Sequence, residues 1–389
     1  MKNEILVEKN IVYFGNDWNA DNKTSSHHIA ERLALKNKLL YVECPGLRRP
    51  KGSSRDFKRI WQKFVKWIKG PKEIQSNFYL LSLFLLPFHS KPKIRKFNEF
   101  LMSQTINRAC SKLNLHDPIL WIIAPHVTSV IDKIKSSLVV HWRTDSHALM
   151  PGVDHDSIAA MELELIQKSD VIFSVNKELY SKMRDINPNT YLTQHGVDVS
   201  HFNQALNPEL PVPDDIKNIP HPIIGFFGLI EEWIDQDLIT HLAKSRPSWS
   251  FVFIGRTATN VDIISSISNV YLLGPRPYLE IPSYAKVFDV AIIPFIVNEL
   301  TLNSNPLKLR EYLAAGLPVV STPLPEICKY DEPMVYIATT PDEFLEKIEI
   351  ALKTDSPDQI QKRLDTVAQD SWDARVDEIS RIVQSHLLK

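Results

Sequence analysis

Short apolar runs alternate with helical patterns along the whole chain. Apolar runs without polar alternation are typical of strands buried on both faces, as in a parallel sheet. The segments between them, such as residues 25–35, space their apolar residues as helices that cover a sheet do. In the first half, the predicted strands are residues 11–15, 39–43, 119–124, 138–142, 170–175 and 190–194.

The pattern stops at a proline-rich segment and then starts again. Residues 207–222 contain five prolines and no periodicity, which predicts a linker. The strands predicted after it are residues 223–228, 251–255, 270–274, 289–295, 318–322 and 334–338. We therefore predict an α/β protein with two doubly wound domains. The predicted parts are a domain at 1–204, a linker at 205–222, a domain at 223–370 and a last helix within 371–389.

The clearest local signal is the sequence NPLKLREYLAAGLPVV at residues 305–320. Asn305 is a good N-cap and Pro306 suits the first helical position, whereas Gly316 and Pro318 end the helix. Ligands of parallel sheets bind beyond the carboxyl ends of the strands, and in a protein of two such domains the cleft between them is the expected site. The amino end of this helix should therefore face the ligand.

A helix amino end attracts anions through its free N–H groups and its dipole. Ser304 and Asn305 add polar side chains there, and Lys308 adds a positive charge. Glu311 lies about one turn further on the same face, where its carboxylate can accept bonds from two sugar hydroxyls. Together, the helix amino end and these four side chains suit the binding of a nucleoside diphosphate. The alternative is a capped surface helix with an ordinary Lys308–Glu311 ion pair.

Residues 294–322, PFIVNELTLNSNPLKLREYLAAGLPVVST, resemble the nucleotide-sugar signature of GT-B glycosyltransferases. Further segments match the same enzymes in the same order, namely residues 18–34, 40–50, 192–202 and 269–295. The resemblance is to bacterial members that build exopolysaccharides and teichuronic-acid-like polymers. It implies two Rossmann-like domains with a deep cleft, a donor bound to the second domain, and a last helix that crosses back to the first.

The resemblance also implies roles for single residues. Glu311 would hold the donor ribose, and Ser304, Asn305 and Lys308 would hold the diphosphate. Two further loop residues, Gly228 and Arg256, would complete the donor site. The loop residues near the nucleotide base would be Gly274, Pro275, Arg276 and Tyr278. Many retaining members carry a glutamate at the position of Asn303, which leaves both the donor sugar and the stereochemical course open.

Transfer to a hydroxyl requires a group that takes up its proton. HWRTDSH at 141–147 follows a predicted strand, so Asp145 is the predicted base and His147 the alternative. Asp145 could instead cap the following helix or pair with Arg143.

The long polar loop at residues 15–28 should contribute to an acceptor site. Trp18 could stack on a sugar face, and Asn16, Asp17 or His28 could bind its hydroxyls, unless His28 is an interior histidine. His195 also ends a predicted strand, and Gly196 is predicted to supply a tight turn there.

Charge is unevenly distributed, although the formal net charge of -1 argues against nucleic-acid binding. Residues 47–72 contain ten lysines and arginines against one aspartate, with aromatic residues near one helical face. This composition suits an anionic membrane surface, or else a solvated helix face. Three scattered cysteines and a polar amino-terminal segment indicate the cytoplasm, with peripheral contact at the inner face of the plasma membrane.

These observations and the resemblance predict an enzyme that transfers a hexosyl or uronosyl unit from a nucleoside-diphosphate sugar to a glycan or polyprenyl-linked acceptor. The resemblance implies UDP as the nucleotide. No cofactor or metal is expected, because the helix end and Lys308 can stabilise the departing diphosphate. The alternatives are a GT-B-type sugar-nucleotide epimerase and a catalytically degenerate scaffold that binds sugar nucleotides.

Overall fold

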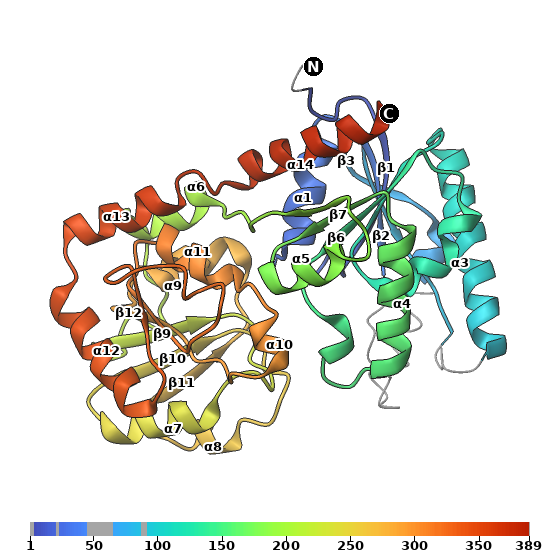
Figure 1. The fold of residues 1–389 in the computed structure, drawn as a ribbon. Coiled ribbons are helices and arrows are strands. Elements are labelled where there is room, and N and C mark those ends of the chain that lie inside the picture. The colour runs from blue at the N-terminus through green and yellow to red at the C-terminus, as the bar shows by residue number, and fades with distance from the viewer. Residues whose placement is uncertain (1–3, 21–22, 45–64, 87–91, 389) are drawn as a thin grey trace. The chain divides into compact units, whose positions relative to one another are not determined.

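The computed structural model describes residues 4–20, 23–44, 65–86 and 92–388. The chain forms two compact units (Figure 1). The first unit combines Met1–Gln194 with Arg375–Lys389, and the second unit is His195–Ala374. The second unit is thus inserted in the sequence between two parts of the first.

The first unit is built on a sheet with the strand order β3-β4-β2-β1-β5-β6-β7-β8 in the described residues. Its neighbouring strands are parallel except for β3 and β4, so the predicted parallel sheet is confirmed. The strands are β1 (Asn10–Gly15), β2 (Lys38–Glu43), β3 (Lys72–Gln75), β4 (Phe78–Ser82), β5 (Ile119–Ile122), β6 (Leu138–Arg143), β7 (Val171–Ser174) and β8 (Thr190–Leu192).

Both faces of this sheet are buried, which explains the continuous apolar runs. On one face, Val12, Leu40 and Leu120 share a core with residues of α3 (Pro92–Lys112) and α4 (His155–Lys168). On the other face Tyr13 stacks on Tyr41 and Trp121, with ring centroids 5.5 and 6.0 Å apart. Helix α1 (Ser25–Ala34) covers this aromatic layer, and Figure 1 shows α1 and α3 on opposite sides of the sheet. The remaining helix of this half, α5 (Lys177–Arg184), packs beside β7 and β8.

The sequence pattern did not predict β3 and β4. Residues 78–82 form β4, which pairs in parallel with β2, so part of the apolar run at 79–88 belongs to the core of the sheet. β3 was not predicted because all four of its residues are exposed, so its sequence lacks the apolar pattern of a buried strand.

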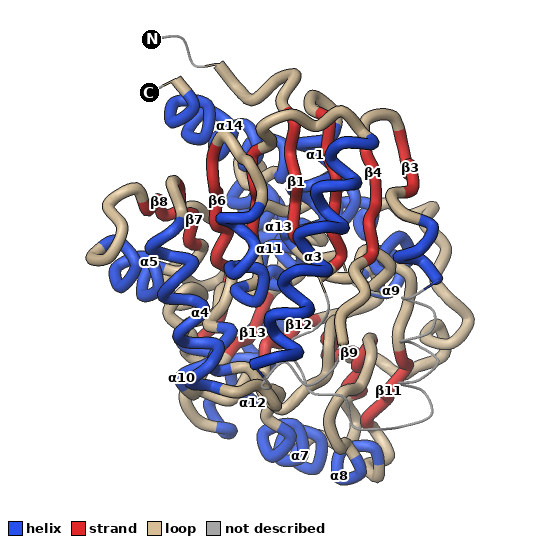
Figure 2. Tube along the Cα trace, turned by 90° about the vertical axis from the view of Figure 1, so that its right-hand side faces the viewer, coloured by secondary structure: helices blue, strands red, loops and turns tan. Residues whose placement is uncertain are grey.

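The second unit contains a parallel sheet with the order β11-β10-β9-β12-β13-β14 in the described residues, drawn in red in Figure 2. Its strands are β9 (Ile223–Phe227), β10 (Ser250–Ile254), β11 (Val270–Gly274), β12 (Val290–Ile293), β13 (Val319–Ser321) and β14 (Val335–Ile337). Its helices are α6 (Val199–Phe202), α7 (Gln236–Ser245), α8 (Asp262–Ser265), α9 (Ile281–Ala285), α10 (Glu299–Leu302), α11 (Leu307–Ala314), α12 (Pro341–Thr354) and α13 (Pro357–Val367). The predicted α/β class is confirmed for both units.

The proline-rich segment is packed against the second unit rather than acting as a free spacer. Ile216 and Ile219 are buried in the core of that unit. The Lys286 ammonium donates hydrogen bonds to the carbonyls of Asn207 and Leu210, at 2.9 and 2.7 Å. A segment rich in proline has few backbone N–H groups of its own, so its carbonyls are satisfied by side chains of the unit that it covers.

Residues 195–204 also group with the second unit, although the sequence placed them in the first domain. The backbone N–H of Val197 donates to the carbonyl of Asp370 at 2.8 Å, and the ring of Phe202 stacks on that of Phe227. The last helix, α14 (Trp372–Leu387), begins in the second unit and continues in the first from Arg375.

Candidate functional site

Two strand ends in the second unit approach each other through glycines. Gly228 follows β9 with φ of +136°, and Gly255 follows β10 with φ of +145°, a region that favours glycine. A Cβ on Gly255 would lie 1.8 Å from the carbonyl oxygen of Gly228. A Cβ on Gly228 would lie 2.1 Å from Cε of Lys308. Only glycine fits at either position, so backbone and lysine meet at the carboxyl edge of the sheet.

Lys308, in the first turn of α11, is half-buried against aromatic rings. Its Nζ lies 5.2 Å from the ring centroid of Phe226 and 5.7 Å from that of Phe295. Burial lowers the pKa of Lys308, while the Glu311 carboxylate opposes this shift. Within the described residues no carboxylate lies within ion-pair distance of Lys308. The ammonium therefore retains the capacity to bind an anion.

Glu311 lies on the same helix, and its carboxylate is also half-buried. Burial raises the pKa of Glu311 to about 7, although the nearby Lys308 ammonium lowers it in part. The two groups are not within ion-pair distance, so the alternative of an ordinary surface ion pair is wrong. In the described part of the chain, no donor satisfies the Glu311 carboxylate, which leaves its oxygens available to a ligand.

The start of α11 differs from the sequence prediction. The helix begins at Leu307 with Pro306 in the N-cap position, so Asn305 is not the N-cap. The Asn305 side chain is buried and accepts a hydrogen bond from Nη1 of Arg310 at 3.0 Å. Arg310 needs a buried acceptor, and this demand outweighs the capping preference of asparagine. Gly316, with φ of +78°, ends the helix as predicted.

The residues just before α11 form a short polar turn. Ser304 Oγ donates to the carbonyl of Thr301 at 2.8 Å. Asn303 is buried, and its amide donates to the carbonyl of Glu299 at 2.7 Å. Its Oδ1 has no partner among the described residues. A buried carbonyl oxygen without a donor is unusual, and this one belongs to a residue five positions before Lys308.

The loop after β11 is held by contacts within the second unit. Gly274 adopts φ of +77°, and Arg276 donates from Nε to the Tyr284 hydroxyl at 2.6 Å and pairs with Asp215. The Asp215 carboxylate raises the pKa of Arg276. The ring of Tyr278 stacks on that of His201 at 4.3 Å.

Two further members of the predicted donor set are more open to solvent. Pro275 is exposed and supplies its carbonyl to Nη1 of Arg276. Arg256 is exposed, and its carbonyl accepts the N–H of Ile230 at 3.0 Å. The structure brings Gly228, Lys308 and Glu311 together, whereas Arg276 and Tyr278 already have partners of their own.

The predicted acceptor loop is folded onto the first unit. The ring of Trp18 packs edge-on against Tyr41 and Phe78, with centroids 4.9 and 4.8 Å apart. Trp18 is therefore half-buried beside the aromatic layer, and its stacking on a sugar stays a prediction. His27 forms a capping box with Thr24, the N-cap of α1.

The polar members of this loop differ in exposure. Asn16 and Asp17 are exposed, and the Asn16 amide donates to Thr24 Oγ1 at 3.3 Å. His28 is buried in α1, as the interior alternative predicted. Asn16 and Asp17 thus remain accessible, whereas His28 does not.

His195 is buried in the second unit beside Trp372, with ring centroids 6.1 Å apart. Gly196 does not have a positive φ, so the predicted role in a tight turn is wrong. A Cβ on Gly196 would lie 2.8 Å from Cα of Trp372. Glycine is favoured here because the Trp372 backbone lies too close for a side chain. His195 therefore packs where the chain passes into α14.

Asp145 lies between two side chains that are bound to one carboxylate. Arg143 Nη2 is 2.9 Å from Glu162 Oε2, and the backbone N–H of His147 donates to Glu162 Oε1 at 2.8 Å. Asp145 neither pairs with Arg143 nor caps a helix, since α4 is capped by Asp154. The half-buried Asp145 carboxylate has no partner in the part of the chain that is described. Sequence reasoning missed Glu162, although it lies on the inner face of a predictable helix.

The described residues contain neither a cluster of metal ligands nor a membrane-spanning helix. No group of three His, Cys, Asp or Glu side chains there could hold a metal ion. No helix in those ranges has the length and apolarity needed to cross a bilayer. Most of the basic stretch 47–72, residues 47–64, lies outside the described residues.

The second unit matches a known family. Residues 221–354 match the family described as "Glycosyl transferases group 1". The chain is also 32% identical over 187 residues to TuaH of Bacillus subtilis (strain 168), which is named as a teichuronic acid biosynthesis glycosyltransferase. That match takes in 46% of this chain and 47% of TuaH, about half the length of the relative.

Solved structures are similar over nearly the whole chain. Sucrose-phosphate synthase from Thermosynechococcus elongatus has a TM-score of 0.71 at 12% identity, and the match covers 97% of this chain and 99% of that one. HepE of Anabaena, solved in complex with UDP, has a TM-score of 0.65 at 12% identity, with 97% and 100% covered. At such identities the likeness shows the fold, and it confirms the predicted GT-B class.

Burial of Glu311 should make stability depend on pH. A pKa raised from 4.5 to about 7 means that the folded state loses stability as pH rises through that window. Glu311→Gln removes the buried charge, so it should raise the unfolding temperature relative to wild type more at pH 8 than at pH 5. Thermal unfolding at both values checks this.

The matched control is Glu299→Gln, at an exposed position of α10. Its unfolding temperature should differ from that of wild type by the same amount at both pH values. An equal effect of Glu311→Gln at pH 5 and pH 8 would contradict the burial of its charge.

Proposed function

We propose that this chain, which has the GT-B fold, is a group 1 glycosyltransferase that transfers a hexosyl or uronosyl residue from a nucleoside-diphosphate sugar to a glycan or lipid-linked glycan acceptor. The observation that carries the proposal is the half-buried Lys308 ammonium, which lies against the strand-end glycine Gly228 and has no carboxylate partner in the described residues. An anion of the size and charge of a diphosphate would compensate it.

The residues around Lys308 fit the other parts of such a donor. Because Gly228 and Gly255 carry no side chains, the ends of β9 and β10 pack closely and Lys308 lies against Gly228, where we expect phosphate oxygens to meet its ammonium. Glu311 lies one turn further along α11, where its oxygens can accept hydrogen bonds from the ribose hydroxyls. Asn303 Oδ1 offers an acceptor for a hydroxyl of the donor sugar.

The proposed reaction breaks the bond between the anomeric carbon and the diphosphate oxygen and forms a bond from that carbon to the acceptor oxygen. The electron pair of the broken bond goes to the diphosphate, whose growing negative charge is stabilised by Lys308 and the amino end of α11. Asp145 takes up the proton of the acceptor hydroxyl, since its carboxylate has no other partner in the described chain. Neither step requires a metal ion.

UDP is the nucleotide that we favour. The Anabaena protein HepE, which shares the fold, was solved in complex with UDP. The relationship to TuaH supports an acceptor in the synthesis of a cell-surface polysaccharide. An epimerase or a degenerate scaffold remains the alternative, and product analysis separates the three: a glycoside, an isomerised sugar nucleotide or no product.

A lipid-linked acceptor would require contact with the inner face of the plasma membrane. Residues 47–72 have the composition for such contact, and within their described part Ile68 is 64% exposed between Lys66 and Lys69. An exposed apolar side chain flanked by lysines suits an anionic lipid surface.

Lys308→Met should weaken UDP binding by about ten- to a hundredfold, because a charge-assisted hydrogen bond contributes roughly 1.5–3 kcal/mol. Calorimetry with UDP, with and without magnesium, measures the change. Lys353→Met, at an exposed position of α12, is the matched control and should bind as wild type does. An unchanged UDP dissociation constant for Lys308→Met would show that the diphosphate does not bind at this site.

Asp145→Asn should reduce glycoside formation by about a hundredfold or more, because general base catalysis contributes about that much. UDP affinity should not change, since the donor residues belong to the second unit. Mass spectrometry of the products measures transfer and also detects an isomerised sugar nucleotide. Turnover close to that of wild type would show that Asp145 is not the base.

Charge neutralisation of Lys58, Lys63, Lys66 and Lys69 should at least halve the fraction of protein that sediments with phosphatidylglycerol vesicles. The control replaces the same number of exposed lysines in the second unit: Lys217, Lys244, Lys329 and Lys353. Equal loss in both sets would indicate a general charge effect and argue against a membrane surface at 47–72.

A further inference from the structure

The segment from Arg143 to His147 is held at both ends by one buried carboxylate. We propose that Glu162 is a positioning residue that fixes this segment and thereby holds the Asp145 carboxylate in place to accept the proton of the acceptor. The inference rests on the proposed function, because it assigns Glu162 a part in that reaction. Glu162 itself touches neither the predicted base nor the donor residues.

The geometry joins a strand, a loop and a helix at one point. Arg143 is the last residue of β6, and its Nη2 lies 2.9 Å from Oε2 of Glu162 in α4. The N–H of His147 donates to Oε1 of Glu162 at 2.8 Å, and His147 Nδ1 lies 3.3 Å from the same oxygen. All three side chains are less than a tenth exposed. Each oxygen of one carboxylate therefore holds one end of the segment.

Both contacts of Glu162 are charge-assisted. Burial alone would raise the pKa of Glu162, but the hydrogen bond from His147 and the charge of Arg143 outweigh burial and lower it. Glu162 is therefore ionised at neutral pH. Arg143 Nε and Nη1 have no partner in the described residues, so Glu162 is the carboxylate on which this buried guanidinium depends.

The neighbouring His141 does not compete for Glu162. Its Nδ1 contacts the carbonyl of Ile122 at 2.9 Å, and burial followed by the charge of Arg143 lowers the pKa of His141 to about 3. The ring is therefore neutral, and Arg143 supplies the positive charge of this cluster. The clamp formed by Arg143, Glu162 and His147 leaves Asp145, at the centre of the segment, without a partner of its own among the described residues.

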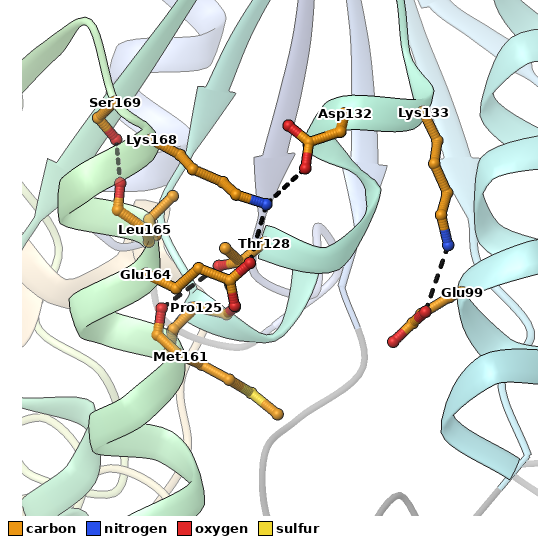
Figure 3. A network of polar contacts seen from close by, with 10 residues as sticks. All are labelled: Glu99, Pro125, Thr128, Asp132, Lys133, Met161, Glu164, Leu165, Lys168 and Ser169. Carbon is orange, nitrogen blue, oxygen red and sulfur yellow. Dashed lines mark hydrogen bonds and ion pairs between the residues drawn. The ribbon is translucent and has the colours of Figure 1, made fainter. Parts of the chain in front are cut away.

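Helix α4 is anchored by contacts that do not involve Glu162, as Figure 3 shows. Lys168 at its end contacts Asp132 at 2.5 Å and Glu164 at 2.8 Å. Thr128 Oγ1 donates to the carbonyl of Met161 at 3.5 Å, from the 3₁₀ helix Pro125–Lys133. Replacing Glu162 should therefore release the segment 143–147 while the helix stays in place.

The experiment compares Glu162→Ala and Glu162→Gln with Glu164→Gln, a control on the same helix that breaks only a surface ion pair. Glutamine keeps one acceptor oxygen for the His147 N–H but loses the charge for Arg143, so it should show an intermediate effect and also guards against failure of the alanine variant to fold. Hydrogen exchange by mass spectrometry, UDP calorimetry and the glycoside assay are run on all three full-length variants.

Amides of residues 143–149 should exchange at least tenfold faster in Glu162→Ala, with α4 and the second unit unchanged. Transfer should fall by about a hundredfold in kcat, because a displacement of about 1 Å at a reacting group has that effect. The donor KM and the UDP affinity should stay within twofold of wild type. A residue with a merely structural role would instead change exchange across the whole first unit.

Unchanged exchange in Glu162→Ala would overturn the clamp. Faster exchange with an unaltered kcat would overturn the positioning role but leave the proposed function intact. Faster local exchange in a protein whose wild type forms no glycoside would confirm the clamp and overturn the proposed function instead.

Discussion

Burial of an ammonium group without a carboxylate partner is the arrangement on which the site in the second unit depends. Lys308 lies against Phe226 and Phe295, and its pKa is lowered because the charged form is desolvated. Cation–π attraction to these two rings offsets part of the hydration free energy that the ammonium loses on burial. The parallel sheet supplies the rest of the constraint, since its strand ends bring Gly228 against the lysine. A bound anion relieves what the protein alone leaves uncompensated.

The two units treat buried charge in opposite ways. In the first unit the Arg143 guanidinium is paired with Glu162, and the pKa of Glu162 is lowered despite burial. In the second unit the pKa of Glu311 is raised and that of Lys308 is lowered, because neither is close enough to neutralise the other. Compensated charge gives a fixed geometry, whereas uncompensated charge gives affinity for a ligand. Under the proposed function, the first property serves the uptake of a proton and the second serves the binding of a diphosphate.

Much of the fold could be predicted from the sequence, because strands buried on both faces leave continuous apolar runs. The exposed strand β3 left no such run and was missed. The placement of Lys308 and Glu311 on one helix, and its end at Gly316, were predictable because they depend on local sequence alone. Asn305 was misassigned because its partner, the buried Arg310, could not be inferred from capping preference. Glu162 was missed for a related reason: its partners lie in another element, and only folding brings them together.

The interrupted first unit has a consequence for how the protein is made. Residues 375–388 leave the ribosome only after the whole second unit, yet Ile379 and Val383 are fully buried, His386 bonds to Tyr191 at 2.9 Å and Asp377 lies 3.5 Å from Lys36. The surface of the first unit that α14 covers therefore stays uncovered while the second unit is synthesised. During this time the second unit can fold alone. Contacts between residues so far apart in sequence form slowly during folding. The order of synthesis thus makes the second unit the first to be complete and leaves the first unit as the part most exposed to chaperones and proteases.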